Sequence, residues 1–225
     1  MLPVSQKEYS NSGNHEVLSK VPKTAKYILD IGCGSGANAH IMSRDGKVVD
    51  GITISEIEAT SARLVCRNVY VHNLENGLPE DIEQIYDCVI CSHVLEHICF
   101  PETLLADIHN VLRSDGQLII ALPNLLYYKN RFRILFGYFE YRDTGLMDYT
   151  HFRWYTFVSA QKMLKDSSYK LVHASVEGSF PLLGIRKILP HSISDLIDTA
   201  ACNIIPGLFG YQMLYIAVPI LERSK

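Results

Sequence analysis

Three glycines at alternate positions, Gly32, Gly34 and Gly36, directly follow a short apolar run at residues 27–31. The run offers almost no polar face to water, which predicts a buried strand of a parallel sheet. Glycine at this spacing permits a tight turn with positive φ and lets a ligand lie against bare backbone, which a Cβ atom would block. A helix is expected at residues 37–44, so the loop would point backbone N–H groups into a crevice at the carboxyl end of the strand. This stretch therefore predicts an open α/β sheet with a nucleotide-type binding site.

The identity of the ligand depends on the residues around the glycines. Gly32, Gly34 and Ala37 also fit the dinucleotide fingerprint G-x-G-x-x-A, which is a weak signal alone. Asp30 argues against a dinucleotide, because a carboxylate there would oppose a pyrophosphate but suit the cationic sulfonium and amino group of S-adenosylmethionine. The second expected strand, residues 47–54, also lacks the closing acid that binds the ribose of NAD. The pattern favours S-adenosylmethionine, and a strand-to-helix turn without a ligand is the alternative.

The segment Asp30-Ile31-Gly32-Cys33-Gly34-Ser35-Gly36 resembles the first motif of the class I S-adenosylmethionine-dependent methyltransferases. The resemblance implies a Rossmann-like, seven-stranded, mostly parallel sheet with helices on both faces and an antiparallel final strand. It also implies S-adenosylmethionine as the cofactor. The residues of this motif expected to contact the cofactor are Asp30, Gly32, Cys33, Gly34 and Gly36.

The remaining elements are expected from alternating apolar runs and amphipathic segments with short connections. The expected strands are residues 27–31, 47–54, 69–72, 86–91, 117–122, 170–176 and 211–218. The expected helices are residues 14–21, 37–44, 56–67, 101–112 and 157–166. We expect one domain over residues 1–225, with an N-terminal leader at residues 1–22 and a cap insertion at about residues 125–156, after the fifth strand. An apolar segment at residues 180–208 joins the last two strands.

Composition sets limits on partners and location. The formal net charge of −3 gives no bulk electrostatic reason to bind nucleic acid. No uncharged apolar run reaches the roughly 18 residues of a membrane span, and the N-terminus lacks the pattern of a signal peptide. A location in the cytoplasm is therefore expected, and peripheral membrane contact stays open. The oligomeric state is not predicted.

The six cysteines are expected to be free thiols, because the chain carries no signal for an oxidising compartment. Cys88 and Cys91 form a C-x-x-C pair, but they lie inside an apolar run that is typical of a core strand. No second cysteine or histidine pair lies at zinc spacing from them. We therefore expect these cysteines to pack in the core, and we expect no metal site.

The ribose site departs from the pattern of class I methyltransferases. Thr53 stands where most members have an acidic residue that binds both ribose hydroxyls, although cyclopropane fatty acid synthases have a similar G-x-T-x-S segment. A hydroxyl makes one weaker hydrogen bond where a carboxylate makes a charge-assisted pair, a loss of about 1 to 2 kcal/mol. Glu56 or Glu58, one turn into the next helix, is expected to compensate.

Further cofactor contacts are expected from other loops. Asn73 stands where family members often have an aspartate that recognises the adenine amino group, and its side-chain oxygen still accepts a hydrogen bond. A polar Asn-Gly turn is the alternative there. Tyr9, in the leader, is expected to stack on the cofactor or face its sulfonium, unless the leader is a frayed tail. Leu74 and Ser92 complete the expected set.

Residues 92–97, Ser-His-Val-Leu-Glu-His, follow the fourth expected strand and resemble the fourth motif of small-molecule methyltransferases, which lies beside the methyl group. His93 and His97 are four positions apart, so we expect them to share a helix face with Glu96 beside them. A neutral imidazole near pH 7 is a natural acceptor for the proton of a methylated hydroxyl or amine. For each histidine, a core or capping role is the alternative.

The expected cap begins with a basic and aromatic segment of helical period, residues 125–136. Cations beside aromatic rings would suit a phosphate, a glycan or a membrane surface. Tyr128 and Arg131 are the substrate-binding candidates in this segment. An ordinary packed helix is the alternative.

Residues 141–156 resemble the D-x-G-x-x-D-x-T-H-x-R-F-x-T segment of a bacterial group of methyltransferase-domain proteins, many of which accompany cell-envelope glycan assembly. The likeness to the MetW-like proteins of methionine biosynthesis is more distant. His151 is the leading candidate for the catalytic base in this loop. Asp148 would orient it, and Arg153 would hold an anionic group of the substrate. The alternative is that the loop only attaches the cap to the sheet.

The expected activity is O-methylation, and less so N-methylation, of a sugar, a glycan or another small-molecule acceptor. Transfer needs an acceptor lone pair held behind the methyl carbon, and a sugar hydroxyl also needs a base. That base is His151 or a member of the group His93, Glu96 and His97. Two alternatives stay open: a MetW-like partner or regulator of a metabolic enzyme without its own methyl transfer, and a cyclopropane-synthase-like enzyme acting on lipids.

Overall fold

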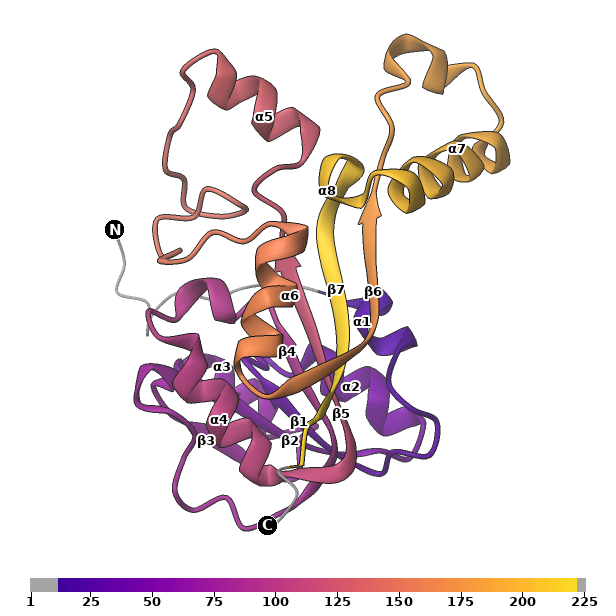
Figure 1. The fold of residues 1–225 in the computed structure, drawn as a ribbon. Coiled ribbons are helices and arrows are strands. Elements are labelled where there is room, and N and C mark those ends of the chain that lie inside the picture. The colour runs from indigo at the N-terminus through magenta and orange to yellow at the C-terminus, as the bar shows by residue number, and fades with distance from the viewer. Residues whose placement is uncertain (1–11, 222–225) are drawn as a thin grey trace.

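The computed structural model describes residues 12–221, and its centre is one seven-stranded sheet with the strand order β3-β2-β1-β4-β5-β7-β6 (Figure 1). The strands are β1 (Tyr27–Ile31), β2 (Val48–Thr53), β3 (Val69–Val71), β4 (Tyr86–Ser92), β5 (Leu112–Pro123), β6 (Tyr169–Gly178) and β7 (Gly210–Pro219). Strands β1 to β5 pair in parallel, whereas β7 lies antiparallel between β5 and β6. The predicted Rossmann-like sheet with an antiparallel final strand is confirmed.

The strand order reverses at the pair β1 and β4, which lie side by side although β2 and β3 separate them in the sequence. In open α/β sheets, ligands bind beyond the carboxyl ends of the strands at such a switch point. The register pairs Ile31 with Cys91, so both strands end at the same level. The glycine turn after β1 and residues 92–97 after β4 therefore begin next to each other.

Helices cover both faces of the sheet, as predicted (Figure 1). They are α1 (His15–Ser19), α2 (Ala37–Arg44), α3 (Glu56–Ala62), α4 (Pro101–Val111), α5 (Tyr128–Leu135), α6 (Phe157–Asp166), α7 (His191–Ile204) and α8 (Pro206–Phe209). Within residues 12–221, the 3-10 turns are η2 (Leu74–Asn76), η3 (Leu95–His97) and η4 (Leu183–Lys187). Ile28 and Ile90 belong to the core that includes α1 and α2, and Leu29 and Val89 to the core that includes α4 and α6. This alternation is the period of two that a two-sided strand requires.

Helix starts follow local capping signals. Thr156 caps α6 through a reciprocal pair, since its hydroxyl accepts the Ser159 N–H at 3.1 Å and the Ser159 hydroxyl accepts the Thr156 N–H at 2.9 Å. Pro101 occupies the first turn of α4, where its missing N–H costs nothing. Both helices therefore begin where the sequence predicts them.

Two element boundaries differ markedly from the prediction. Helix α3 ends at Ala62 rather than near Arg67, because the chain turns to bring the Arg67 guanidinium to the fully buried Asp50, with Nε 2.9 Å from Oδ1. Strand β5 begins at Leu112 rather than at residue 117, because Leu112 still pairs with Tyr86 of β4. Both differences come from contacts between elements, which local patterns do not contain.

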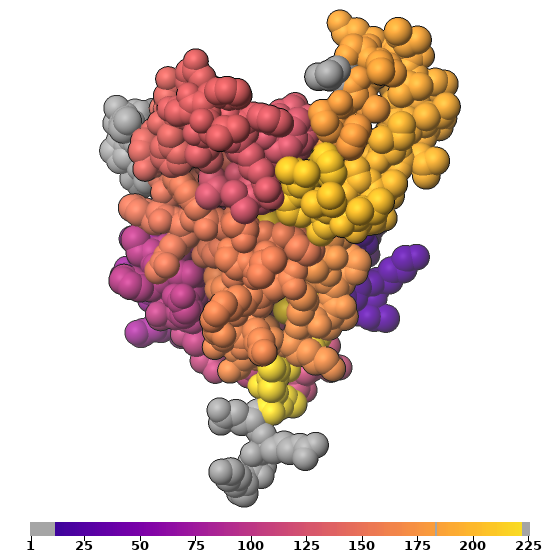
Figure 2. All heavy atoms as spheres, turned by 45° about the horizontal axis from the view of Figure 1, so that its top comes forward, coloured from indigo at the N-terminus to yellow at the C-terminus, as the bar shows by residue number. Residues whose placement is uncertain are grey.

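Two segments project from the end of the sheet where β5 and β6 finish (Figure 1). Residues 124–156 carry α5, which begins at Tyr128 rather than at residue 125 because the Asn124 side chain accepts the Leu126 N–H in a turn. Residues 179–209 carry η4, α7 and α8. Figure 2 shows the two segments as separate protrusions. Within residues 12–221, no helix is long and apolar enough to cross a membrane.

Candidate active site

The glycine turn has the conformation that its sequence predicts. Gly32, Gly34 and Gly36 have φ values of 71°, 53° and 88°. A Cβ atom at Gly32 would lie 2.4 Å from Val94 Cγ2, and one at Gly36 would lie 2.7 Å from Val65 Cγ2. Glycine is therefore required at these two positions both for backbone conformation and for space. The Val94 contact also shows that the turn packs directly against the segment after β4.

Asp30 lies at the end of β1 with 1% of its surface exposed. Its Oδ1 accepts a hydrogen bond from Asn38 Nδ2 at 3.4 Å, whereas its Oδ2 has no hydrogen-bond partner among residues 12–221. Burial raises the pKa of Asp30 to about 7. A buried carboxylate oxygen without a partner is costly, and a cationic amino group would satisfy it. Asp30 therefore fits the role predicted for it toward S-adenosylmethionine.

A carboxylate lies beside Thr53, where the ribose is expected, and α3 supplies it. The Thr53 hydroxyl donates to Glu58 Oε2 at 2.7 Å, and both side chains are buried. Ser55 caps α3 by accepting the Glu58 N–H, which directs this turn toward the end of β2. Glu56 instead pairs with Arg63 at 2.7 Å on the surface. Of the two glutamates considered for compensation, the structure brings Glu58 to Thr53.

The Cys33 side chain lies inside the fold. Its thiol packs against Gly51, where an added Cβ would lie 2.6 Å from Sγ, and beside Cys66. The hydrogen bond with Cys66 and burial raise the pKa of Cys33 far above its usual range. Cys33 would therefore contact a cofactor through its backbone, not its thiol. All six cysteines are free, as predicted.

The loop that is expected to border the adenine forms a capped turn. Asn73 is exposed, and its Oδ1 accepts the Glu75 N–H at 3.1 Å at the start of η2. The polar turn is thus formed, and the same oxygen retains a second lone pair for a ligand. Leu74 packs against the core cluster on this side of the sheet. Tyr9, the expected stacking residue, lies outside the described residues.

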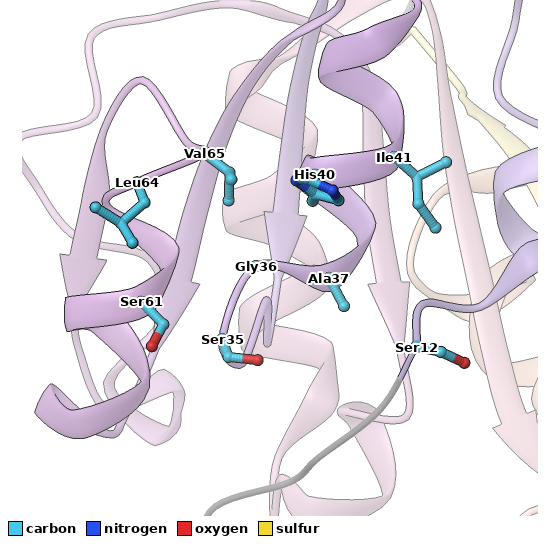
Figure 3. A pocket seen from close by; sticks show the side chains of 9 residues that line it. All are labelled: Ser12, Ser35, Gly36, Ala37, His40, Ile41, Ser61, Leu64 and Val65. Atoms are coloured by element: carbon cyan, nitrogen blue, oxygen red, sulfur yellow. The ribbon is translucent and has the colours of Figure 1, made fainter.

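A surface hollow lies beside the glycine turn, between α2 and α3 (Figure 3). It is lined by Ser12, Ser35, Gly36, Ala37, His40, Ile41, Ser61, Leu64 and Val65. Neither Asp30 nor Thr53 is among them. The hollow is therefore a feature on the outer side of the turn and is not the expected cofactor crevice.

His93 and His97 do not share a helix face, so this prediction was wrong. His93 has a left-handed φ of 56° and its N–H still donates to Ala121 in β5, so the sheet continues to this residue. His97 ends the single 3-10 turn η3. The ring of His93 instead joins two other side chains, with Nε2 2.7 Å from Gln212 Oε1 and Nδ1 3.3 Å from Glu96 Oε1.

The neighbours of His93 determine what its ring does. Gln212 Nε2 donates to Glu177 at 3.2 Å, so Oε1 is the Gln212 atom that faces His93. Both ring nitrogens of His93 therefore face acceptors. Burial disfavours the charged ring, but the bonds to Glu96 and Gln212 outweigh this and raise the pKa of His93. Burial acts to raise the pKa of Glu96, yet the interaction with His93 prevails and lowers it.

His97 is oriented by a chain of hydrogen bonds. The Thr150 hydroxyl donates to Asp148 Oδ1 at 2.7 Å, and Asp148 is buried. That hydroxyl therefore accepts from His97 Nδ1, 2.9 Å away, and the Thr150 carbonyl lies 3.2 Å from the same nitrogen. Because Nδ1 carries the proton, the neutral ring has its lone pair on Nε2.

His151 packs directly against His97. The ring centroids are 4.5 Å apart with an interplanar angle of 75°. His151 Nδ1 lies 2.8 Å from the Leu146 carbonyl, so it also carries its proton there and its lone pair on Nε2. The Asp148 carboxylate accepts from Thr150, so the ring of His151 is oriented by Leu146 and not by this carboxylate, whereas the Asp148 carbonyl accepts the His151 backbone N–H at 3.0 Å. Burial lowers the pKa of His151, which keeps the ring neutral near pH 7.

The loop that carries His151 is attached to the end of β4 through its backbone. The N–H groups of Phe152 and Arg153 donate to the Glu96 carbonyl at 2.9 and 3.0 Å. The Arg153 guanidinium donates to the Cys99 carbonyl at 2.9 Å from Nε and 2.6 Å from Nη2. The attachment that the sequence offered as an alternative is therefore present. It is also what brings His151 to His97.

The substrate candidates in α5 are engaged locally. Arg131 donates from Nε to the Leu126 carbonyl at 2.6 Å and from Nη2 to the Gly207 carbonyl at 3.3 Å. Tyr128 packs edge-on against Tyr127, with ring centroids 4.6 Å apart. Arg131 and Tyr128 therefore support the projecting segment, and any substrate contact would add to these roles.

The sequence pointed to neither Gln212 nor Thr150 nor Asn14 as part of the site. Asn14 Nδ2 donates to Ser92 Oγ at 3.1 Å and to Gln212 Oε1 at 3.0 Å, which links α1, β4 and β7. Thr150 precedes His151 in the motif, so its position was a usable signal. Gln212 lies in an apolar strand far along the chain, and no local pattern marks it.

The fold, with a glycine turn and a histidine–glutamate cluster at the switch point of its sheet, is that of a class I S-adenosylmethionine-dependent methyltransferase. A family model described as a methyltransferase domain matches residues 5–174. The chain therefore belongs to the methyltransferase-domain family. Membership confirms the predicted class, together with S-adenosylmethionine as the cofactor of that class.

Curated relatives match part of the chain. The ubiquinone biosynthesis O-methyltransferase of Pseudomonas aeruginosa is 32% identical over 111 residues, which are 44% of this chain and 45% of that protein. The enzyme of the same name from Pseudomonas entomophila is 27% identical over 117 residues, 47% of each chain. The matched region thus spans less than half the length of these relatives.

Solved structures share the fold over most of the chain. An S-adenosylmethionine-dependent methyltransferase from Archaeoglobus fulgidus has a TM-score of 0.63 at 20% identity and covers 87% of both chains. Magnesium protoporphyrin IX methyltransferase from Synechocystis, solved with bound S-adenosylhomocysteine, has a TM-score of 0.56 at 15% identity over 91% of this chain and 78% of its own. At these identities the likeness concerns the fold.

Proposed function

We propose that the chain transfers a methyl group from S-adenosylmethionine to a hydroxyl oxygen of a small-molecule acceptor. The observation that carries this proposal is the pair His97 and His151, whose Nδ1 atoms donate to protein oxygens and whose lone pairs lie on Nε2. Gly32 packs against Val94, so the segment that carries His97 contacts the glycine turn, and His151 packs against His97. A proton acceptor beside a methyl donor is what O-methylation requires.

The cofactor roles are assigned as follows. Asp30 receives the amino group, because its buried Oδ2 has no partner within the described residues. Glu58 and Thr53 receive the ribose hydroxyls, and Asn73 with Leu74 borders the adenine. Bound there, S-adenosylmethionine supplies a methyl carbon activated by its sulfonium.

The histidines act on the acceptor. A hydroxyl is not ionised near pH 7, so its oxygen becomes a good nucleophile only when a base removes the proton during transfer. His151 is neutral near pH 7 because burial lowers its pKa, and it is the base that we assign first, with His97 as its neighbour. His93 is not assigned as a base, because both of its ring nitrogens face acceptors. An amine acceptor would need this base less, which is why we favour oxygen over nitrogen.

We propose that the acceptor is a sugar or a glycan, because residues 141–156 resemble a segment of methyltransferase-domain proteins that accompany glycan assembly. A phenol is the second candidate, because the curated relatives are named ubiquinone biosynthesis O-methyltransferases.

We also propose peripheral contact with an anionic membrane through the projecting α5. That helix carries Lys129, Arg131 and Arg133 without an acidic residue and exposes Phe132 and Leu135.

Activity against a panel of glycosides, nucleotide sugars and phenols tests the proposal, with labelled S-adenosylmethionine and product mass as readouts. With an accepted substrate, His151→Ala should lower kcat by about 10²- to 10⁴-fold while the Kd for S-adenosylhomocysteine stays unchanged. His173→Ala, an exposed histidine of β6, is the control. Equal kcat in wild type and His151→Ala would contradict the assigned base, and cofactor binding without transfer to any acceptor would favour a partner or regulator.

A further inference from the structure

The side chains of Glu96, His97 and His151 form a cluster with three potential metal-ligand atoms, whereas a catalytic base needs only one side chain. One donor atom from each side chain lies within 4.8 Å of the others. Glu96 is 1% exposed, and its Oε2 has no hydrogen-bond partner among residues 12–221, whereas its Oε1 faces His93. A buried carboxylate oxygen left without a partner is costly unless something cationic occupies the space beside it.

Hydrogen bonds orient the rings of His97 and His151 in the way that is typical of metal-ligating histidines. Ligating histidines donate their other ring N–H to a protein oxygen, which selects the tautomer and holds the ring. His97 Nδ1 donates to the Thr150 hydroxyl, which itself donates to Asp148, and His151 Nδ1 donates to the Leu146 carbonyl. Both rings therefore carry their lone pairs on Nε2.

We infer that Glu96 Oε2, His97 Nε2 and His151 Nε2 bind one divalent transition-metal cation. Two imidazoles and one carboxylate suit Zn²⁺, Mn²⁺, Fe²⁺ or Co²⁺, whereas Mg²⁺ and Ca²⁺ prefer all-oxygen sites. Metal–ligand bonds of about 2.0–2.2 Å place donor atoms of one ion roughly 3 to 3.5 Å apart, so a modest closing of the cluster completes the site. Three protein ligands leave a position for an oxygen of the acceptor, as in catalytic metal sites.

The role of the cation rests on the proposed function. A Lewis acid beside the acceptor lowers the pKa of its hydroxyl, and the proton passes to water. The acceptor oxygen then forms its bond to the methyl carbon as the carbon–sulfur bond breaks, and the electron pair of that bond leaves with the sulfur. With the cation bound, His97 and His151 hold it through Nε2, and water replaces His151 as the acceptor of this proton, while the methyl transfer of the proposed function is unchanged.

The test is metal binding by the full chain without any acceptor. Protein treated with a chelator and freed of it is titrated with Co²⁺ by calorimetry and visible absorption, with Mg²⁺ as a comparison. We expect one Co²⁺ per chain, ligand-field bands typical of nitrogen and oxygen ligands, and much weaker Mg²⁺ binding. Glu96→Gln and His151→Ala should each weaken Co²⁺ binding by about 10- to 100-fold or more, and His173→Ala should leave it unchanged.

The outcomes distinguish failure of the proposed metal site from failure of the proposed methyl transfer. No stoichiometric Co²⁺ binding by wild type overturns the proposal, as does binding that both site variants retain. Unchanged S-adenosylhomocysteine affinity and circular dichroism in Glu96→Gln and His151→Ala exclude misfolding as the cause of any loss. Methyl transfer that persists in protein unable to bind Co²⁺ would keep the proposed function and remove the metal. Site-specific Co²⁺ binding without transfer to any acceptor would do the opposite.

Discussion

Burial in the fold changes the acid–base chemistry of Asp30. Its carboxyl is buried at the end of β1, has one weak partner in Asn38, and titrates near pH 7 instead of near 4. Burial without a cation favours the protonated form, so an arriving amino group and the loss of this proton are linked. With the amino group bound as proposed, Asp30 would couple cofactor binding to pH.

The first prediction concerns this coupling. Below pH 7 the folded protein holds a proton on Asp30 that a bound ammonium group must displace, so the affinity for S-adenosylhomocysteine should rise toward pH 7 and level off above it. The limiting slope is about tenfold per pH unit, as for one proton. Calorimetry between pH 5.5 and about 8.5 measures it. Asp30→Asn should bind weakly with a flat profile, and a flat wild-type profile would refute the assigned contact.

The same group acts on stability with the opposite sign. Between about pH 4 and pH 7 the native state binds more protons at Asp30 than the unfolded chain does, because the folded pKa is raised. The contribution of Asp30 to the free energy of unfolding should therefore fall as pH rises through this window. Without ligand, the difference in free energy of unfolding between Asp30→Asn and wild type should grow in favour of the variant from pH 5 to pH 7. A constant difference measured by urea denaturation would contradict the raised pKa.

Glu58 and Glu56 are a natural matched pair for the ribose assignment. Glu58 is buried and accepts from Thr53, whereas Glu56 is exposed and pairs with Arg63. Glu58→Gln should weaken S-adenosylhomocysteine binding by about tenfold, because a charge-assisted hydrogen bond to a hydroxyl becomes a neutral one. Glu56→Gln should leave the Kd unchanged. Equal Kd values for the two variants, measured by calorimetry, would show that Glu58 does not receive the ribose.

At the scale of elements, the turn between β1 and α2 can be tested with two glycines of the same conformation. Gly32 and Gly46 have φ values of 71° and 72°, but an added Cβ meets Val94 at 2.4 Å in the first and nothing within 4 Å in the second. Gly46→Ala should cost about 1 kcal/mol of stability from backbone strain alone. Gly32→Ala should cost about 2 to 3 kcal/mol more, because overpacking is added to strain. Denaturant melts that give equal losses would contradict the contact between the turn and Val94.

Local patterns predicted most elements, because their signals lie within the elements themselves. The glycines after β1, Pro101 and the Thr156 cap each act within a few residues, and the structure places α2, α4 and α6 where they indicate. Helix α3 was predicted too long because Arg67 is drawn to Asp50, 17 positions earlier. Chain-distant ion pairs of this kind leave no periodic trace in a sequence.

In the site, too, features marked by local motifs were predicted, and features that depend on contacts between distant residues were not. His151 and the histidines after β4 were found because a motif contains them, but the turn at His93 was not foreseen. Its ring is bound to Gln212, 119 positions away, and that contact outweighs the helical spacing of His93 and His97. The partners of the histidines, Leu146 and Thr150, likewise became clear only once the loop was folded.

At the scale of the whole molecule, α5 and the segment of η4 and α7 project from one end of the protein (Figure 2). Both segments expose large apolar side chains. We expect the protein to sediment with vesicles that contain an anionic lipid and less with neutral ones, with binding reduced by salt. Lys129→Glu combined with Arg133→Glu should weaken binding at least tenfold, at about 1 kcal/mol for each cation removed. Lys162→Glu, an exposed lysine of α6, is the control. Equal sedimentation of both variants would refute this membrane face.

The central claim is that S-adenosylmethionine binds at the carboxyl ends of β1, β2 and β4. Thermal unfolding with S-adenosylhomocysteine, with NADH and without ligand tests it most directly. At a hundred times its Kd a ligand stabilises by about 2.7 kcal/mol, or roughly 5 to 11 °C for a chain of this size. We predict such a shift with S-adenosylhomocysteine and none with NADH. The absence of a shift with S-adenosylhomocysteine, or an equal shift with NADH, would contradict the account.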